Sequence, residues 1–172
     1  KTVRRQRQMC IRDRFQMLPK PPPRGPRTGF IYEPPYRIQG ESVAGEHTVI
    51  QIPELGLNFD MGSCPRWALA SGVTAISHGH MDHIGGLPYY FSQRHFQGMG
   101  VGTVVCPPSL VIPLRDMMKS WIALERQRTP FELVGLAPGE EWELKPDVFL
   151  RPFETSHTVP SPVSYTHLTL PT

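Results

Sequence analysis

With 172 residues, 39% of them hydrophobic, the chain has enough apolar material for one buried core, and its length favours a single domain over two. It contains no run of about eighteen apolar residues and no apolar segment after its basic start, so neither a membrane span nor a secretory signal is expected. The net charge of +3 comes from residues 1–28, which hold nine basic residues and one acidic residue. From Gly29 onward, nine basic and fourteen acidic residues give a net charge of −5. The charge therefore does not argue for RNA binding.

Both ends of the chain are expected to lie outside the packed core. Residues 1–28 read as a disordered basic and proline-rich tail, because residues 1–14 show no apolar period and residues 19–27 favour a polyproline conformation. Residues 8–14 and 163–172 also resemble translated sequencing-adapter read-through, so residues 1–14 and 163–172 are expected to be artefactual. On this interpretation both true termini are missing, and residues 29–162 form a truncated domain.

Short β-rich runs bounded by Gly, Pro and polar turns predict strands between these ends. The early strands follow one another directly, whereas the later ones are separated by helical patterns. The predicted strands cover residues 36–39, 48–52, 55–60, 73–77, 102–106, 131–134, 141–145 and 148–153. This alternation predicts a mixed α/β (α+β) fold.

Helical patterns cover residues 66–71, 85–97 and 109–127. The last is the most regular, and Pro113 falls near its first turn, where proline is tolerated. Its apolar residues recur at steps of three and four, which predicts a face packed against the core rather than a ligand site. These residues are Leu110, Leu114, Met117, Trp121 and Leu124.

Four potential metal ligands lie within six residues directly after the strand predicted at 73–77: His78, His80, Asp82 and His83. Imidazole and carboxylate groups are ligands that suit Zn²⁺. Histidines two positions apart project to the same side of an extended loop, whereas Asp82 and His83 are adjacent and would point to a second position. The spacing therefore predicts two neighbouring metal sites. Gly85 and Gly86 follow, either for close backbone approach or as a flexible helix start.

The string from His78 to His83 resembles the signature of the metallo-β-lactamase superfamily. Residues 55–62 look like the superfamily's earlier strand ending in Asp-x-Gly, whose aspartate supports the metal loop by hydrogen bonding. Asp60 is therefore a candidate for this supporting role, with a plain strand-end turn as the alternative. His157, at the end of another predicted strand and 74 residues after His83, suits the family's third metal-binding motif.

The remaining histidines lack such support. His47 and His95 are expected to face solvent, and His167 lies in the suspect tail. Three cysteines at unrelated spacings predict reduced thiols and a cytoplasmic protein rather than a disulfide framework. They are Cys10, Cys64 and Cys106.

Within the superfamily, residues 59–65, 83–90 and 151–161 resemble short-form ribonuclease Z most closely, and the likeness covers about residues 36–161. This resemblance implies the αββα sandwich of the superfamily, of which the chain would hold the N-terminal portion. It also implies two zinc ions per intact active site. Zinc lowers the pKa of bound water to about 7 and neutralises charge that develops on a phosphodiester.

Carried over to this chain, the resemblance implies that His78, His80 and His157 hold one zinc ion, while Asp82 and His83 begin the second site. The bridging aspartate and further histidine of the family find no credible match after His157. The fragment is therefore expected to be inactive alone. Asp82 is the candidate catalytic residue, which orients or deprotonates the attacking water; a role as plain ligand stays open.

The implied function is that of the endoribonuclease that removes 3′ trailers from precursor tRNA. The alternative is another hydrolase on the same scaffold, acting on small phosphodiesters, thioesters or lactones. A non-catalytic partner that keeps the fold is a third hypothesis, against which four ligands in six residues argue. Precursor tRNA is the expected partner, no membrane is expected, and a homodimer is left open.

Overall fold

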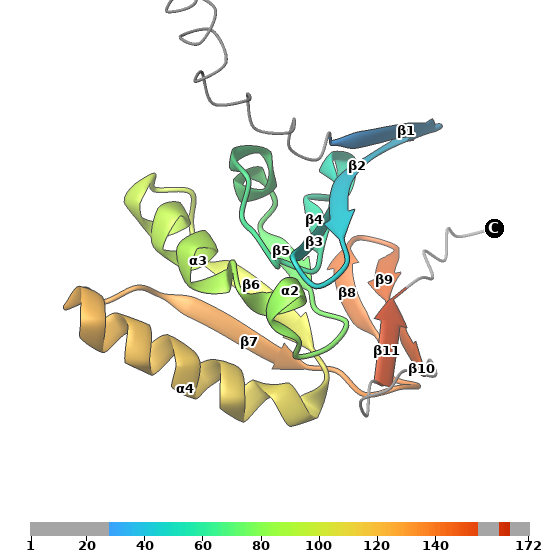
Figure 1. The fold of residues 1–172 in the computed structure, drawn as a ribbon. Coiled ribbons are helices and arrows are strands. Elements are labelled where there is room, and N and C mark those ends of the chain that lie inside the picture. The colour runs from blue at the N-terminus through green and yellow to red at the C-terminus, as the bar shows by residue number, and fades with distance from the viewer. Residues whose placement is uncertain (1–27, 155–161, 166–172) are drawn as a thin grey trace, which may run out of the picture.

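A seven-stranded sheet in which the strands lie in chain order forms the centre of the molecule (Figure 1). The computed structural model describes residues 28–154 and the backbone of residues 162–165. The first four strands pair antiparallel and the last four pair parallel. The strands are β1 (Gly29–Glu33), β2 (Tyr36–Val43), β3 (His47–Ile52), β4 (Leu57–Phe59), β5 (Val73–Ala75), β6 (Gly102–Cys106) and β7 (Phe131–Gly135).

Each parallel pair is joined by a crossover that contains helix, as parallel pairing requires. A 3₁₀ helix, η2 (Arg66–Ala70), joins β4 to β5, and α4 (Pro108–Glu125) joins β6 to β7. Between β5 and β6 lie α2 (Met81–Ile84) and α3 (Leu87–Phe96). A second 3₁₀ helix, η1 (Pro53–Leu55), joins β3 to β4. The expected mixed α/β class is confirmed.

Alternating residues of the sheet serve two separate cores. Val104 and Cys106 of β6 pack in a cluster with residues of η2, α3 and α4. Val105, between them, packs in a second cluster with the hairpin of β8 (Trp142–Lys145) and β9 (Val148–Leu150). The order of layers is thus helices, large sheet and small sheet, which corresponds to three layers of the expected αββα sandwich. A further pair, β10 (Pro152–Glu154) and β11 (Pro162–Tyr165), is antiparallel.

The core face predicted for α4 is correct in its first half and wrong in its second. Leu114 is 2% exposed, but Trp121 is 43% and Leu124 74% exposed. Steps of three and four average 3.5 residues, whereas an α-helix turns every 3.6, so the stripe rotates away from the sheet. The buried face continues instead through Met118, which is 1% exposed.

Other differences concern element boundaries. The strand predicted at 55–60 begins later because η1 occupies its start, and the strand predicted at 148–153 is divided into β9 and β10. The sequence did not predict β1. All residues of this strand are exposed, so no alternation of buried apolar and exposed polar positions marks it in the sequence. Both predicted tails, residues 1–28 and 163–172, lie largely outside the described residues, and the domain boundaries stay predictions.

Two further predictions concern membrane spans and the cysteines. Among the residues that the structure describes, no helix is long and apolar enough to cross a membrane. Cys64 and Cys106 are free thiols, and burial raises the pKa of each to about 12. Both thiols therefore stay protonated at neutral pH.

Arg94, on α3, is a buried cation that donates to three backbone carbonyls. It is 5% exposed; its Nη1 donates to the carbonyls of Leu69 (2.6 Å) and Ser71 (3.0 Å), and its Nη2 donates to that of Met99 (2.6 Å). We expect Arg94→Lys to lower the free energy of unfolding by about 2 kcal/mol, because one ammonium cannot reach all three carbonyls. Urea unfolding measures this, with exposed Arg115→Lys as control; equal stability of the two variants would contradict it.

Candidate metal centre

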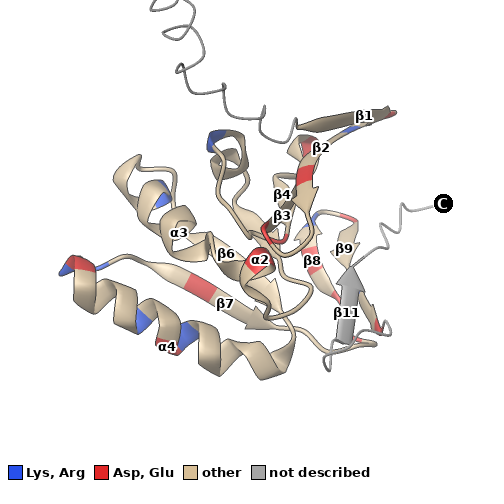
Figure 2. Ribbon diagram, viewed as in Figure 1, with Lys and Arg blue, Asp and Glu red and all other residues tan. Residues whose placement is uncertain are grey.

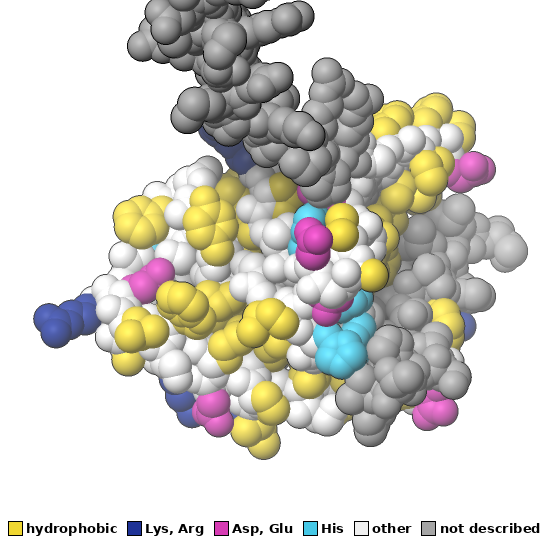
Figure 3. Space-filling view, in the orientation of Figure 1, with side chains coloured by type: hydrophobic (Ala, Val, Ile, Leu, Met, Phe, Trp, Pro, Cys, Tyr) yellow, Lys and Arg dark blue, Asp and Glu magenta, His cyan; other side chains and the backbone are white. Residues whose placement is uncertain are grey.

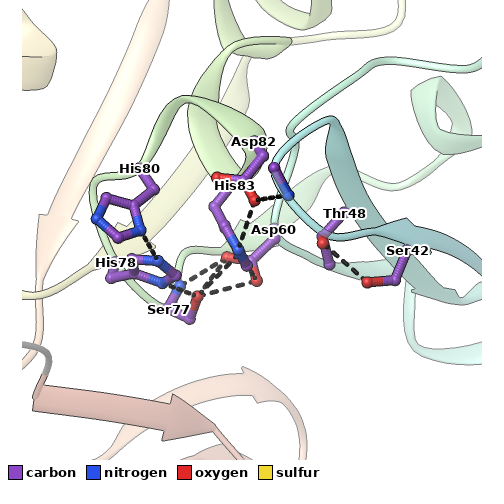
Figure 4. A network of polar contacts seen from close by, with 9 residues as sticks. Ser42, Thr48, Asp60, Ser77, His78, His80, Asp82 and His83 are labelled. Carbon is purple, nitrogen blue, oxygen red and sulfur yellow. Dashed lines mark hydrogen bonds and ion pairs between the residues drawn. The ribbon is translucent and has the colours of Figure 1, made fainter. Parts of the chain in front are cut away.

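The metal-ligand candidates lie where β5 ends. Beyond Ala75 the chain stays pinned to the sheet for one more residue, since the N–H of Ile76 donates to the carbonyl of Val105 at 2.8 Å. The loop then runs to His80, which is extended and directly precedes α2. The four candidate ligands therefore lie close together beyond the end of β5, with His78 and His80 on the loop and Asp82 and His83 on α2 (Figure 4).

Asp60, directly after β4, lies at the centre of this network. Its φ of 58° is left-handed, and its carboxylate accepts hydrogen bonds from two sides. Oδ1 accepts from the backbone N–H of Ser77 (2.8 Å) and, like Oδ2, lies 2.9 Å from the Ser77 hydroxyl. Oδ2 also accepts from Nδ1 of His83 at 2.8 Å. One carboxylate therefore joins the ends of β4 and β5 to α2.

His78 and His80 form the first ligand pair. Nε2 of His78 lies 2.8 Å from Nδ1 of His80, with the ring centroids 4.5 Å apart. His78 is 7% exposed, and its other nitrogen, Nδ1, lies 3.0 Å from the hydroxyl of Ser77. The two nitrogens that face each other belong to residues two positions apart in the sequence, as predicted for an extended loop.

Asp82 and His83 form the second ligand pair. Nε2 of His83 lies 3.6 Å from Oδ2 of Asp82, which also accepts the N–H of Gly45 at 3.0 Å from the β2–β3 turn. The hydrogen bond that His83 donates to Asp60 raises the pKa of His83, although burial opposes it. Desolvation works against ionisation of Asp82, but the Gly45 N–H and the neighbouring His83 and His80 rings lower its pKa overall.

The two pairs fit the chemistry of zinc without completing a site. Ligand atoms on a tetrahedral zinc, with bonds of about 2.0–2.1 Å, lie about 3.4 Å apart. The observed separations of 2.8 Å and 3.6 Å fall on either side of this value. The rings of His78 and His83 are 4.1 Å apart, so the pairs are neighbours. Within the described residues no group of three His, Cys, Asp or Glu side chains forms a metal site.

The histidines outside the ligand loop differ in their surroundings. His157, the expected third ligand of the first pair, and His167 lie outside the described residues. His95 is exposed on α3, as expected. His47 was expected on a solvent-facing turn, but it is the first residue of β3, half-buried, with Nε2 3.4 Å from a carboxylate oxygen of Glu41. Cross-strand pairing of β2 with β3 brings these two residues together.

Close backbone packing behind α2 is a feature that the sequence only partly indicated. A Cβ on Gly62 would lie 1.8 Å from the carbonyl oxygen of Asp82, and one on Gly86 would lie 2.6 Å from the carbonyl carbon of Ser63. Gly86 also donates its N–H to the carbonyl of Met61 at 2.7 Å. For the Gly85–Gly86 pair, close approach is therefore the better of the two interpretations.

Charge around the loop is mainly acidic. Figure 2 shows acidic residues on α2 and on the adjoining β2–β3 hairpin, while α4, farther away, carries both basic and acidic residues. In Figure 3 a group of histidine side chains reaches the surface beside acidic ones. In the part of the chain that the structure describes, no row of Lys or Arg borders this surface. An anionic substrate would meet imidazoles and carboxylates there.

Comparison with known proteins identifies three similar curated sequences, although no family model matches. The nuclear ribonuclease Z of Triticum aestivum is 38% identical over 126 residues, which are 73% of this chain and 72% of that protein. Two Arabidopsis thaliana proteins match over the same share of this chain: the chloroplastic tRNase Z TRZ2 at 37% identity and tRNase Z TRZ1 at 36%. The chain spans 36% of the former and 45% of the latter.

Two solved structures overlap in part with this one, each at 16% sequence identity. The metallo-β-lactamase fold protein YhfI of Bacillus subtilis gives a TM-score of 0.46, covering 73% of this chain and 48% of that one. Zn²⁺-bound PqqB of Methylobacterium extorquens gives 0.43, covering 67% and 41%.

Proposed function

Because the chain belongs to the ribonuclease Z family, we propose that it serves in a zinc-dependent endoribonuclease that removes 3′ trailers from precursor tRNA. The observation that carries this proposal is the arrangement of two ligand pairs at the end of β5. His78 Nε2 faces His80 Nδ1, and His83 Nε2 lies near Asp82 Oδ2. Hydrogen bonds to Ser77 and Asp60 occupy the opposite nitrogens of His78 and His83.

The proposed ligands follow from these pairs. His78 and His80, joined by His157, would hold one zinc ion; Asp82 and His83 would contribute to a second, with Asp60 supporting the set through its hydrogen bonds. Zinc bound there would lower the pKa of water to about 7 and neutralise charge on a phosphodiester. The metal count and its identity as zinc belong to the proposal.

Asp82 is the proposed catalytic residue of this chain. Its Oδ2 is held by the Gly45 N–H, and its pKa is lowered, so the carboxylate stays ionised at neutral pH. An ionised carboxylate in this place can orient a water molecule or accept its proton. A role as plain ligand is the alternative; Asp82→Asn in the genomic reading frame that includes this sequence separates the two, because retained zinc with lost cleavage of precursor tRNA would argue for the catalytic role.

A second candidate function is hydrolysis of small phosphodiesters, thioesters or lactones. The acidic surroundings of α2 favour it, because tRNA binding usually draws on basic side chains. Family membership argues for tRNA. Cleavage of bis(p-nitrophenyl) phosphate without cleavage of precursor tRNA would decide for the second candidate.

Location and assembly are further proposals. The proposal of a cytoplasmic location rests on Cys64 and Cys106 being free thiols rather than disulfide partners, whereas the names of two relatives specify the chloroplast and the nucleus. A homodimer would bury the apolar side chains that α4 exposes at Ile112 and Leu124. Light scattering of the purified chain measures the assembly.

The test begins with metal content. Purified chain is expected to retain zinc, His78→Gln to lose it, and His95→Gln to retain it, because His95 is an exposed histidine on α3. Mass spectrometry of the dialysed proteins measures bound metal. Equal zinc in the two variants would overturn the proposed ligand set.

Cleavage is the second part of the test. The 172-residue chain is expected not to cut precursor tRNA, because its sequence offers no match for the family's bridging aspartate and further histidine that would join Asp82 and His83. The genomic reading frame that includes this sequence should cut it, with sensitivity to chelators. A reading frame without a further aspartate and histidine after Ser161 would overturn the two-metal proposal.

A further inference from the structure

Ser77 lies between the carboxylate of Asp60 and the ring of His78. Its hydroxyl oxygen is 2.9 Å from each oxygen of Asp60 and 3.0 Å from Nδ1 of His78. The residue is half-buried and directly follows the apolar strand end. Nδ1 of His83 is farther from the hydroxyl, at 3.4 Å, and closer to Asp60, at 2.8 Å. Each of the two rings therefore has its own nearest partner at Nδ1.

The donors and acceptors in this chain of contacts have one consistent arrangement. An ionised carboxylate only accepts, so the single proton of the Ser77 hydroxyl is donated to Asp60. The hydroxyl oxygen then accepts, and Nδ1 of His78 must carry the proton that it donates. A neutral imidazole with its proton on Nδ1 has its lone pair on Nε2. Nε2 is the atom that faces His80.

We propose that Ser77 is a positioning residue that fixes the Nδ1–H tautomer of His78 and so directs the Nε2 lone pair toward the metal. This inference rests on the proposed function, which places zinc between His78 and His80. Asp60 fixes the same tautomer of His83 directly. One carboxylate thus orients two ligands, one of them through the hydroxyl.

The hydroxyl is not needed to attach the loop to β4. The backbone N–H of Ser77 already donates to Oδ1 of Asp60 at 2.8 Å, and the N–H of Asp60 donates to the carbonyl of Ala75 at 2.8 Å. Neither bond involves the side chain of residue 77, so we expect both to persist when the hydroxyl is removed. The hydroxyl adds contacts to both oxygens of Asp60 and links them to Nδ1 of His78.

The test compares Ser77→Thr with Ser77→Val, which have nearly the same shape and differ by the hydroxyl. Nitrogen-15 spectra of the metal-free protein at about pH 8.5, where imidazoles are neutral, report the tautomer of His78. Zinc affinity is measured by competition with a chelating dye. Ser77→Thr should keep the Nδ1–H tautomer and the affinity; Ser77→Val should shift His78 toward Nε2–H and weaken zinc binding roughly 10-fold or more.

Ser42→Val is the matched control, because Ser42 is exposed on β2 and its hydroxyl contacts only Thr48 among the described partners. Should Ser77→Val not fold, Ser77→Ala removes the hydroxyl without adding volume. An unchanged tautomer in the hydroxyl-free variants, or equal weakening by Thr and Val, overturns the inference. If the wild-type chain binds no zinc, the proposed function is wrong. The inference about Ser77 is then tested only by whether removal of the hydroxyl changes the tautomer of His78.

Discussion

Replacing Gly62 by alanine is expected to destabilise the chain by about 3 kcal/mol or more and to release bound zinc. The added Cβ would lie 1.8 Å from the carbonyl oxygen of Asp82 and 2.8 Å from the backbone nitrogen of Thr48. Both are backbone atoms, so no side-chain rotation relieves the clash. α2 must move away from the end of β4. The movement strains the hydrogen bond from the Met61 N–H to the carbonyl of His83, now 2.7 Å.

Urea unfolding and zinc competition together measure the effect of Gly62→Ala. Gly72→Ala is the matched control: Gly72 lies on the same β4–β5 connection, and its Cβ would meet nothing closer than Nη2 of Arg94 at 3.7 Å. The control should keep both stability and zinc affinity within about 1 kcal/mol of the wild type. If Gly62→Ala behaves like the control, close packing of α2 against β4 is not what holds Asp82 and His83 in place.

The ligand loop could be predicted from the sequence because its chemistry is local. His78, His80, Asp82 and His83 follow a buried strand, and their pairing into two sets follows from positions two apart on a loop and adjacent at a helix start. β6 was predicted with its bounds unchanged at residues 102–106, since a short apolar run there is enclosed by turns. These features are determined by residues that lie close together in the sequence.

What the sequence did not predict depends on contacts between distant segments. The hydroxyl of Ser77 acquires its partner only because β5 pairs parallel with β4, which sets Phe59 opposite Ala75. Gly45 reaches Asp82 from 37 residues away, through the β2–β3 turn. The close approach at Gly62 likewise requires α2 to lie across the end of β4. Periodicity and spacing hold no information about such contacts, which arise from the register of the sheet.

Replacing Asp60 by asparagine is expected to weaken zinc binding by roughly 10- to 100-fold. Asparagine tolerates the left-handed φ of 58° and keeps the shape of the side chain, so the change isolates the second carboxylate oxygen. The NH₂ group of asparagine would donate a hydrogen bond at the position where Oδ2 of Asp60 accepts one from His83. It cannot accept from Nδ1 of His83, and it offers Ser77 one acceptor in place of two. Asp147→Asn is the control, at an exposed aspartate with φ of 64°.

Loss of the Nδ1 acceptor should also be visible without metal. His83 would move its proton toward Nε2, the atom that lies 3.6 Å from Asp82, and nitrogen-15 spectra report this change. In wild type the raised pKa of His83 adds stability that is present below its ordinary value of 6.5 and is lost as pH rises through the raised value. Asp60→Asn should remove that pH dependence in urea unfolding with chelator. Unchanged zinc affinity and pH dependence would mean that the loop backbone alone orients both rings.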